Sequence, residues 1–271
     1  MEVKTLVFDM DGTLLNEKKV MDQVMIKYSK EIQAAGLDII IASGRLDFMV
    51  YSYLTELGID TPVIGCNGAI IRKKGDAEPI YANYMPLEEL YQLIDKAKEL
   101  DLLFHVFTTD CLIGLEHAGR LAYYSDTNSE KIAEEQVPIF VGEEYLTEEY
   151  LKKAIKFLIV STDEEPSQKF AEYAKSLDLE VVSSGDDLVD VMSKGINKGF
   201  GLQKMAELGL IDLETTMAFG DNYNDLEMLS VVKYPIVMEN AVEEIKGIAY
   251  EICGSCDDNG CGNYVVEKFL K

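Results

Sequence analysis

Basic residues are scarce in this chain. Its 271 residues include 25 lysines and arginines against 49 aspartates and glutamates, which gives a formal net charge of −24. A surface this acidic repels a nucleic-acid backbone over most of its area. Nucleic acid is therefore not an expected partner. An anionic small substrate has to be captured locally, by a metal ion or by a few placed cations.

Long hydrophobic runs are also absent. No segment approaches the roughly 18 consecutive apolar residues of a membrane helix. The first residues, Met1 to Thr5, lead directly into an apolar strand and lack the pattern of a signal peptide. We therefore expect a cytoplasmic protein with no membrane partner. With 48% hydrophobic residues the chain can bury one large core or two smaller ones, and its length favours two.

Cysteine and histidine are few. The five cysteines are odd in number and scattered, which does not make a disulfide framework. Cys253, Cys256 and Cys261 lie close together in the sequence, but a structural zinc site needs four ligands and no histidine is near them. Their role stays open. His105 and His117 are isolated, and the chain has no Gly-x-x-x-x-Gly-Lys-Ser/Thr loop, which counts against a P-loop nucleotide enzyme.

What the chain does have is a pair of carboxylates at the end of its first apolar run. Asp9 and Asp11 follow Leu6–Phe8 and precede Gly12. Residues two apart in an extended segment share a face, so both carboxylates can enter one pocket. They repel each other unless a cation or a shared proton relieves them. An acidic turn is the alternative, because Asp-Gly is also an ordinary loop signal.

Two further predicted strands also end in polar clusters. The run 37–42 ends in Ser43, Gly44 and Arg45, and the run 215–219 ends in the segment 220–225. Short strands that alternate with helical stretches, such as 20–35 and 198–208, predict an α/β fold with a doubly wound, Rossmann-like, mostly parallel sheet. One parallel sheet would bring all three clusters to the same edge.

The middle of the chain follows a different pattern. A helix over 87–100, strands around 103–108 and 111–116, an acidic connector and a further helix–strand alternation predict an α+β domain of roughly 100 residues. We therefore expect a core domain formed by residues 1–84 and 190–271, with a second domain inserted at 85–189.

The polar clusters suit metal-assisted phosphoryl transfer. That chemistry needs carboxylates, a small hydroxyl beside backbone donors at a helix start, and a lysine. Mg²⁺ prefers hard oxygen ligands, which Asp9 and Asp221 can supply. Helix capping by itself would also favour Asp and Asn in the segment 220–225, but a Gly-Asp opening at a strand end fits capping less well.

Four segments in order resemble the motifs of the haloacid dehalogenase superfamily of phosphohydrolases, specifically its Cof-type subfamily with a large α+β cap of the C2 type. The segments are 9–13, Ser43 within 42–45, Lys198 within 195–199, and 220–225. The resemblance covers the whole chain, and the inserted domain falls between the second and third motifs, where Cof-type caps lie. Each motif is weak alone, but four in order are specific.

The resemblance implies catalytic roles for three residues. Asp9 would be the nucleophile that forms an aspartyl-phosphate. Asp11 would protonate the leaving alcohol and later deprotonate water. Lys198 would neutralise charge on Asp9 and on the phosphoryl group. Lys194 is a rival because it also precedes a glycine, but Lys198 stands immediately before the helical run. In this superfamily the second acid, Asp11, is associated with phosphatases and mutases.

Binding roles follow from the same resemblance. Asp9, Asp221 and the backbone carbonyl of Asp11 would hold Mg²⁺. Ser43 would hold a phosphate oxygen through its hydroxyl and backbone N–H, and Asp225 would orient Lys198. The other phosphate-binding candidates are Gly44, Arg45 and Asn224. For Arg45, as for Asn67, a surface ion pair or a turn is an equal alternative.

We therefore expect a Mg²⁺-dependent phosphatase that acts on a small phosphorylated metabolite through an aspartyl-phosphate. Sugar phosphates are the first choice, with pyridoxal phosphate and flavin mononucleotide behind them. The alternative is a phosphomutase of sugar phosphates that uses the same residues. The sequence leaves open the substrate, the cap residues that select it, and whether the protein is a monomer or a homodimer.

Overall fold

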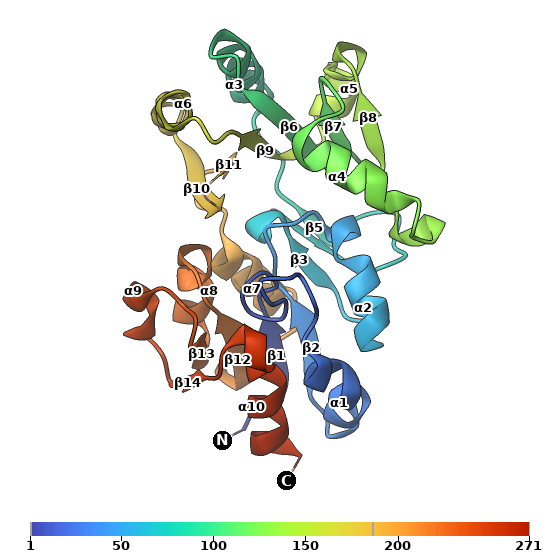
Figure 1. Ribbon diagram of the computed structural model, residues 1–271, viewed down its shortest axis with the longest axis vertical. Helices are drawn as coiled ribbons and strands as arrows, with labels where there is room; N and C mark the ends of the chain where they lie inside the picture. Colours follow the sequence, from blue (N-terminus) through green and yellow to red (C-terminus); the bar gives the residue numbers. More distant parts are fainter. Residues whose placement is uncertain (1, 186, 271) are drawn as a thin grey trace. The chain divides into compact units, whose positions relative to one another are not determined.

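The computed structural model describes residues 2–185 and 187–270, and it forms two compact units. Unit 1 consists of Met1–Asp76 and Asn197–Lys271, and unit 2 consists of Ala77–Ile196. The domain boundaries expected from the sequence, after residue 84 and before residue 190, both lie inside unit 2. Each unit is built on one large sheet, and β3 (Val63–Gly65), β4 (Ile70–Arg72) and β5 (Tyr81–Ala82) form a smaller third sheet (Figure 1).

Unit 1 is built on a five-stranded sheet in which every pairing is parallel. In spatial order its strands are β14 (Glu251–Cys253), β13 (Tyr234–Met238), β12 (Thr216–Gly220), β1 (Thr5–Phe8) and β2 (Asp38–Ile41). The central strand β12 and its neighbour β1 are buried at every residue, as expected of a parallel sheet covered on both faces. The α/β fold with a mostly parallel sheet is confirmed.

Helices and short strands complete unit 1. They are α1 (Gln23–Ala34), α2 (Tyr51–Leu57), β3 (Val63–Gly65), β4 (Ile70–Arg72), α7 (Lys198–Glu207), α8 (Leu226–Val231), α9 (Glu243–Lys246) and α10 (Gly260–Phe269). The helices pack in pairs, α1 with α10 and α7 with α8. The start of α1 is fixed by Asp22, whose Oδ1 accepts the N–H groups of Val24 and Met25 at 2.9 Å.

The order of the strands determines where a site can form. From β1 the chain moves to β2 on one side, and it later returns to β12 on the other side. Strand order therefore reverses between β1 and β12, and open α/β sheets bind ligands outside the carboxyl ends of the strands at such a switch point. Asp9 follows β1 directly, and Asp221 follows β12 directly.

Unit 2 contains a six-stranded, mostly antiparallel sheet. In spatial order its strands are β10 (Leu179–Gly185), β11 (Leu188–Ser193), β9 (Ala154–Val160), β6 (Leu103–Thr108), β7 (Leu112–Gly114) and β8 (Ile139–Val141). Its other elements are β5 (Tyr81–Ala82), α3 (Leu87–Glu99), α4 (Gly119–Asn128), α5 (Glu148–Leu151) and α6 (Glu164–Ser176). The stretch expected to be an acidic connector thus contains α4 and β8.

The sheet of unit 2 has two different faces because side chains alternate along each strand. Phe104 and Phe157 stack on one face, with ring centroids 5.1 Å apart, and belong to the same buried apolar cluster as residues of α3 and α6. The alternate positions include His105, Lys156 and Asp190, all buried. Lys156 Nζ lies 2.5 Å from Asp190 Oδ1, so the buried charges of that pair are matched.

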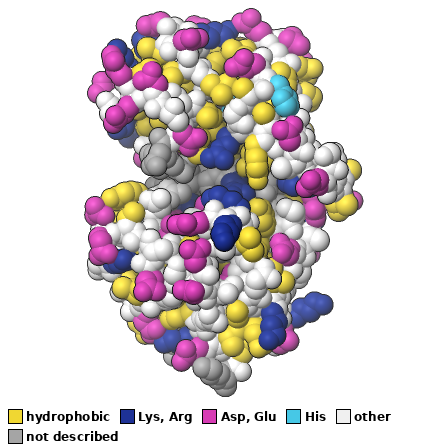
Figure 2. Space-filling model, viewed as in Figure 1, with side chains coloured by type: hydrophobic (Ala, Val, Ile, Leu, Met, Phe, Trp, Pro, Cys, Tyr) yellow, Lys and Arg dark blue, Asp and Glu magenta, His cyan; other side chains and the backbone are white. Residues whose placement is uncertain are grey.

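The exterior of the protein reflects its composition. Acidic side chains are scattered over the face shown in Figure 2 and do not gather into a single patch. Across residues 2–185 and 187–270, no helix has both the length and the apolar character needed to cross a membrane.

Candidate active site

Asp9 lies where β1 leaves the centre of the unit 1 sheet. The preceding residues Leu6 to Phe8 have no exposed surface, and the ring of Phe8 stacks on Phe219 of β12 with centroids 4.5 Å apart. The backbone N–H of Asp9 donates to the Phe219 carbonyl at 3.0 Å, which extends the β1–β12 pairing by one residue. The Asp9 side chain is consequently held in place, and only 6% of the residue is exposed.

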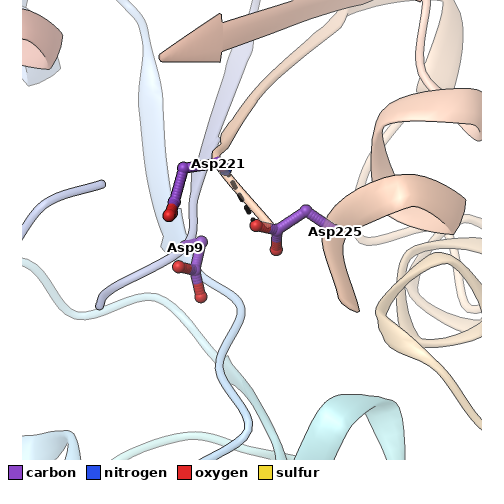
Figure 3. A group of neighbouring side chains, drawn as sticks. All are labelled: Asp9, Asp221 and Asp225. Atoms are coloured by element: carbon purple, nitrogen blue, oxygen red, sulfur yellow. Dashed lines mark hydrogen bonds between the residues drawn. The ribbon is translucent and has the colours of Figure 1, made fainter. Parts of the chain in front are cut away.

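Asp221 and Asp225 come from the end of β12 and the turn that follows it. Oδ2 of Asp225 accepts the backbone N–H groups of Asp221 at 3.0 Å and of Asn222 at 3.1 Å, which folds the turn back on itself (Figure 3). Gly220 makes this possible, because a Cβ there would lie 2.6 Å from the Asp225 side chain. The sequence Gly-Asp at the strand end therefore has a steric reason.

Lys198 is the first residue of α7. Asn197 caps that helix by accepting the Phe200 N–H at 2.8 Å. The Lys198 ammonium donates to Asp9 Oδ1 and, at 2.6 Å, to Asp225 Oδ1. Burial opposes its positive charge, but the two carboxylates outweigh burial and raise the pKa of Lys198.

One lysine faces three carboxylates in this group. Oxygens of Asp9, Asp221 and Asp225 lie within 4.8 Å of one another (Figure 3). Burial, with the charges of Asp225 and Asp221, raises the pKa of Asp9 well above its usual value despite Lys198. Burial and Asp225 raise the pKa of Asp221 to about 7. The group therefore carries negative charge that a further cation would relieve.

The carboxylates differ in which oxygens remain available. Both oxygens of Asp225 are occupied, one by Lys198 and the other by backbone N–H groups. Asp221 Oδ1 accepts the Thr13 hydroxyl at 2.8 Å. Within the part of the chain that the structure describes, Oδ2 of Asp9 and Oδ2 of Asp221 accept no hydrogen bond. Asp9 and Asp221 are thus the residues with a hard oxygen left for a divalent cation.

Asp11 has different partners from Asp9. Its Oδ2 accepts Arg45 Nε at 2.9 Å, and its Oδ1 accepts Arg45 Nη2 at 2.6 Å and Lys19 Nζ at 2.8 Å. Burial by itself would raise the pKa of Asp11, but Arg45 and Lys19 together lower it to about 2. Arg45 thus forms an ion pair with Asp11, but its side chain is only 16% exposed, so this is not the surface ion pair considered as its alternative.

The other expected phosphate-binding residues lie in unit 1 as well. Ser43 is buried, and its hydroxyl accepts the Arg45 N–H at 3.2 Å. The backbone N–H of Ser43 donates to the Ile64 carbonyl at 2.8 Å. Both this N–H and the hydroxyl were expected to hold phosphate, but the N–H is already used in strand pairing and the hydroxyl is not. Gly44 lies beside Asn67, and Asn224 is a half-buried residue of the turn 223–225.

Three lysines and a threonine show where the sequence pattern predicted the contacts of the site and where it did not. Lys194 pairs with Asp178 at 2.5 Å, whereas Lys198 reaches Asp9. The contact of Thr13 with Asp221 was not foreseen, although Thr13 lies within the first motif. Lys19 gave no signal at all, because it belongs to an exposed run of charged residues.

A family model of haloacid dehalogenase-like hydrolases matches residues 6–265. The chain belongs to this family. The haloacid dehalogenase-like hydrolases are enzymes, and the resemblance seen in the four motifs is thereby confirmed.

Several relatives of this hydrolase have names that state an activity. It is 28% identical to the pyridoxal phosphate phosphatase YbhA of Escherichia coli, over 100% of both chains. It is also 28% identical to the 5-amino-6-(5-phospho-D-ribitylamino)uracil phosphatase YwtE of Bacillus subtilis, over 99% of this chain and 98% of that one. A haloacid dehalogenase-like hydrolase structure from B. subtilis matches with a TM-score of 0.82 at 25% identity, over 98% of this chain and 100% of the other.

Proposed function

We propose that this hydrolase is a Mg²⁺-dependent phosphatase that acts on a small phosphorylated metabolite through an aspartyl-phosphate. One observation carries the proposal: the Asp9 carboxylate is buried at the switch point of the sheet, with Oδ1 bound by Lys198 and Oδ2 without a hydrogen bond among the described residues. A carboxylate fixed in this way keeps lone pairs on both oxygens, so one oxygen can hold a cation while the other attacks phosphorus.

The reaction runs in two steps on the residues of this chain. An oxygen of Asp9 attacks phosphorus while the bond from phosphorus to the ester oxygen breaks. Arg45 and Lys19 keep Asp11 ionised before the substrate binds, so the proton that Asp11 passes to the departing alkoxide comes from the monoanion of the phosphate ester. Water then attacks the same phosphorus, Asp11 takes its proton, and the Asp9 carboxylate is released together with phosphate. Lys198 neutralises charge on Asp9 and the phosphoryl oxygens, while Asp225 holds the lysine in place.

Asp9, Asp221 and the backbone carbonyl of Asp11 would hold Mg²⁺. The donor set fits, because the available atoms are hard oxygens and the carboxylate group carries excess negative charge. When bound, the ion supplies positive charge to the transferring phosphoryl group. The Ser43 hydroxyl, Gly44 and Asn224 would hold phosphate oxygens. Unit 2 would serve as the cap that selects the leaving group.

The substrate class is a phosphate monoester of a small metabolite. The names of YbhA and YwtE both specify such molecules, pyridoxal phosphate and a phosphorylated ribitylamino uracil. Sugar phosphates and pyridoxal phosphate are therefore the first candidates. Phosphate release from a panel of phosphorylated metabolites, measured with Mg²⁺, identifies the substrate. Isomerisation of a sugar phosphate without free phosphate would instead identify a phosphomutase.

The nucleophile is tested with Asp9→Asn. We expect this variant to release phosphate from p-nitrophenyl phosphate at least about 10³-fold more slowly than the unmodified protein. It should remain folded, because Lys198 keeps Asp225 as a carboxylate partner and the amide oxygen of Asn can still accept its N–H. Exposed Asp38→Asn is the matched control and should keep full activity. Undiminished turnover by Asp9→Asn would contradict the proposal.

A further inference from the structure

Asp11 is fixed by a fork of donors. Arg45 approaches its carboxylate side-on, with Nε on Oδ2 at 2.9 Å and Nη2 on Oδ1 at 2.6 Å. Lys19 adds a third donor to Oδ1 at 2.8 Å. Two parallel N–H bonds from one guanidinium define the plane and direction of a carboxylate, which a single charge does not do.

Arg45 is itself anchored more firmly than the carboxylate that it holds. Its side chain is 16% exposed, against 40% for Asp11. Its Nη1 lies 3.3 Å from the Tyr53 hydroxyl, and its guanidinium lies 5.7 Å from the centre of the Tyr53 ring. Its backbone carbonyl accepts the Cys66 N–H at 2.8 Å, and its own N–H donates to Ser43 Oγ. Arg45 thus orients Asp11, and not the reverse.

The arrangement leaves Asp11 room for one more partner. A carboxylate offers about four lone-pair sites, and three are used here, two on Oδ1 and one on Oδ2. The remaining site is on Oδ2, the oxygen bound only by Arg45 Nε.

We propose that Arg45 is a positioning residue for Asp11, which directs the remaining site of Oδ2 toward the leaving-group oxygen, and that Arg45 does not act on the phosphate directly. The inference rests on the proposed function, because it assigns Arg45 a part in the proton transfer that Asp11 performs there. It replaces the expectation from the sequence that Arg45 binds phosphate.

The test is a double-mutant cycle over Arg45→Gln and Asp11→Asn, measured on aryl phosphates with different leaving groups. Nitrophenolate leaves without a proton, whereas phenolate needs one, so only phenyl phosphate depends strongly on Asp11. We expect Arg45→Gln to lower kcat on phenyl phosphate about 10- to 100-fold and on p-nitrophenyl phosphate less than about threefold, with KM nearly unchanged. In the Asp11→Asn background it should add less than about twofold.

Two further variants distinguish the effect of the two parallel hydrogen bonds from Arg45 to Asp11 from the effect of its positive charge. Arg45→Lys keeps the charge but cannot bind both oxygens, so we expect it to behave like Arg45→Gln. Lys19→Met should show a smaller loss with the same leaving-group dependence, while its exposed neighbour Lys18→Met serves as the unaffected control. Circular dichroism and thermal unfolding of each variant show that the fold is retained.

Several results would overturn the inference. They are an equal loss on both substrates, a raised KM for p-nitrophenyl phosphate, losses that multiply in the double variant, or full rescue by Arg45→Lys. Each would make Arg45 a phosphate ligand or a simple charge while leaving the phosphatase intact. If the unmodified protein hydrolyses no phosphate ester, the proposed function itself fails.

Discussion

The ammonium group of Lys198 lies 2.6 Å from Oδ1 of Asp225, and neither side chain has any exposed surface. The second oxygen of Asp225 binds the backbone of Asp221 and Asn222. Asp225 therefore fixes two things at once: the cation beside Asp9 and the turn that carries Asp221. Asp225 was expected to orient Lys198, and it also holds the turn that carries Asp221.

Asp225→Ala should be strongly destabilising. It leaves a buried ammonium with Asp9 as its remaining carboxylate partner and removes the acceptor of two N–H groups, so we expect a loss of about 3–5 kcal/mol in the free energy of unfolding. Urea denaturation measures it. Glu207→Gln is the control, because it breaks an exposed ion pair with Lys204 and should cost less than about 1 kcal/mol. Equal stability of the two variants would refute the structural role of Asp225.

Gly12→Ala should impair activity by displacing Asp221. Gly12 has φ +90°, and a Cβ there would lie 2.3 Å from Asp221 Oδ2. Gly75 has the same φ of +90° but no atom within 4 Å of its Cβ position, so Gly75→Ala introduces the backbone strain without the clash. We expect Gly12→Ala to lower kcat about 100-fold and Gly75→Ala to leave it nearly unchanged. Similar kcat values for both variants would show that the clash is harmless.

Magnesium should stabilise the protein as well as activate it. A cation that binds only the folded state at 100 times its Kd adds about 2.7 kcal/mol to the free energy of unfolding. We therefore expect Mg²⁺ to raise Tm by several degrees relative to NaCl of equal ionic strength. Asp221→Asn should lose this shift, and thorough chelation should abolish phosphate release. A shift that persists in Asp221→Asn would place the ion elsewhere.

His105 should make the protein less stable in acid. Burial lowers the pKa of His105 to about 4 in the folded state, against about 6.5 in the unfolded chain. As pH falls below about 6.5, the unfolded state therefore binds the proton first, and stability is lost progressively down to about pH 4.

The corresponding experiment compares His105→Leu with the unmodified protein at two pH values. Between pH 7 and pH 5 the unmodified protein should lose about 2 kcal/mol relative to His105→Leu. Replacement of the exposed His117 by Leu is the matched control for removal of a histidine. Parallel stability curves for His105→Leu and the unmodified protein would contradict the assignment.

Some elements were recognisable from local pattern and others were not. The strands before Asp9 and Asp221 were predictable because short apolar runs stop abruptly at polar residues. Helix α4 was taken as part of a connector because its buried residues, Leu121 and Tyr124, are too few to give a clear helical period. The elements after α8 were not predicted at all, although β13 with five residues is longer than β1 with four and α10 has ten.

The sequence by itself determined the α/β class, the family resemblance and the identity of the acidic residues, because these depend on local periodicity and on residues adjacent in the chain. Only the tertiary structure decided which groups meet. Lys198 contacts Asp9 across 189 positions, and Arg45 turns to Asp11 because the order of the parallel strands places β2 beside β1. Strand order is a property of the whole packed sheet, so neither contact follows from the sequence pattern alone.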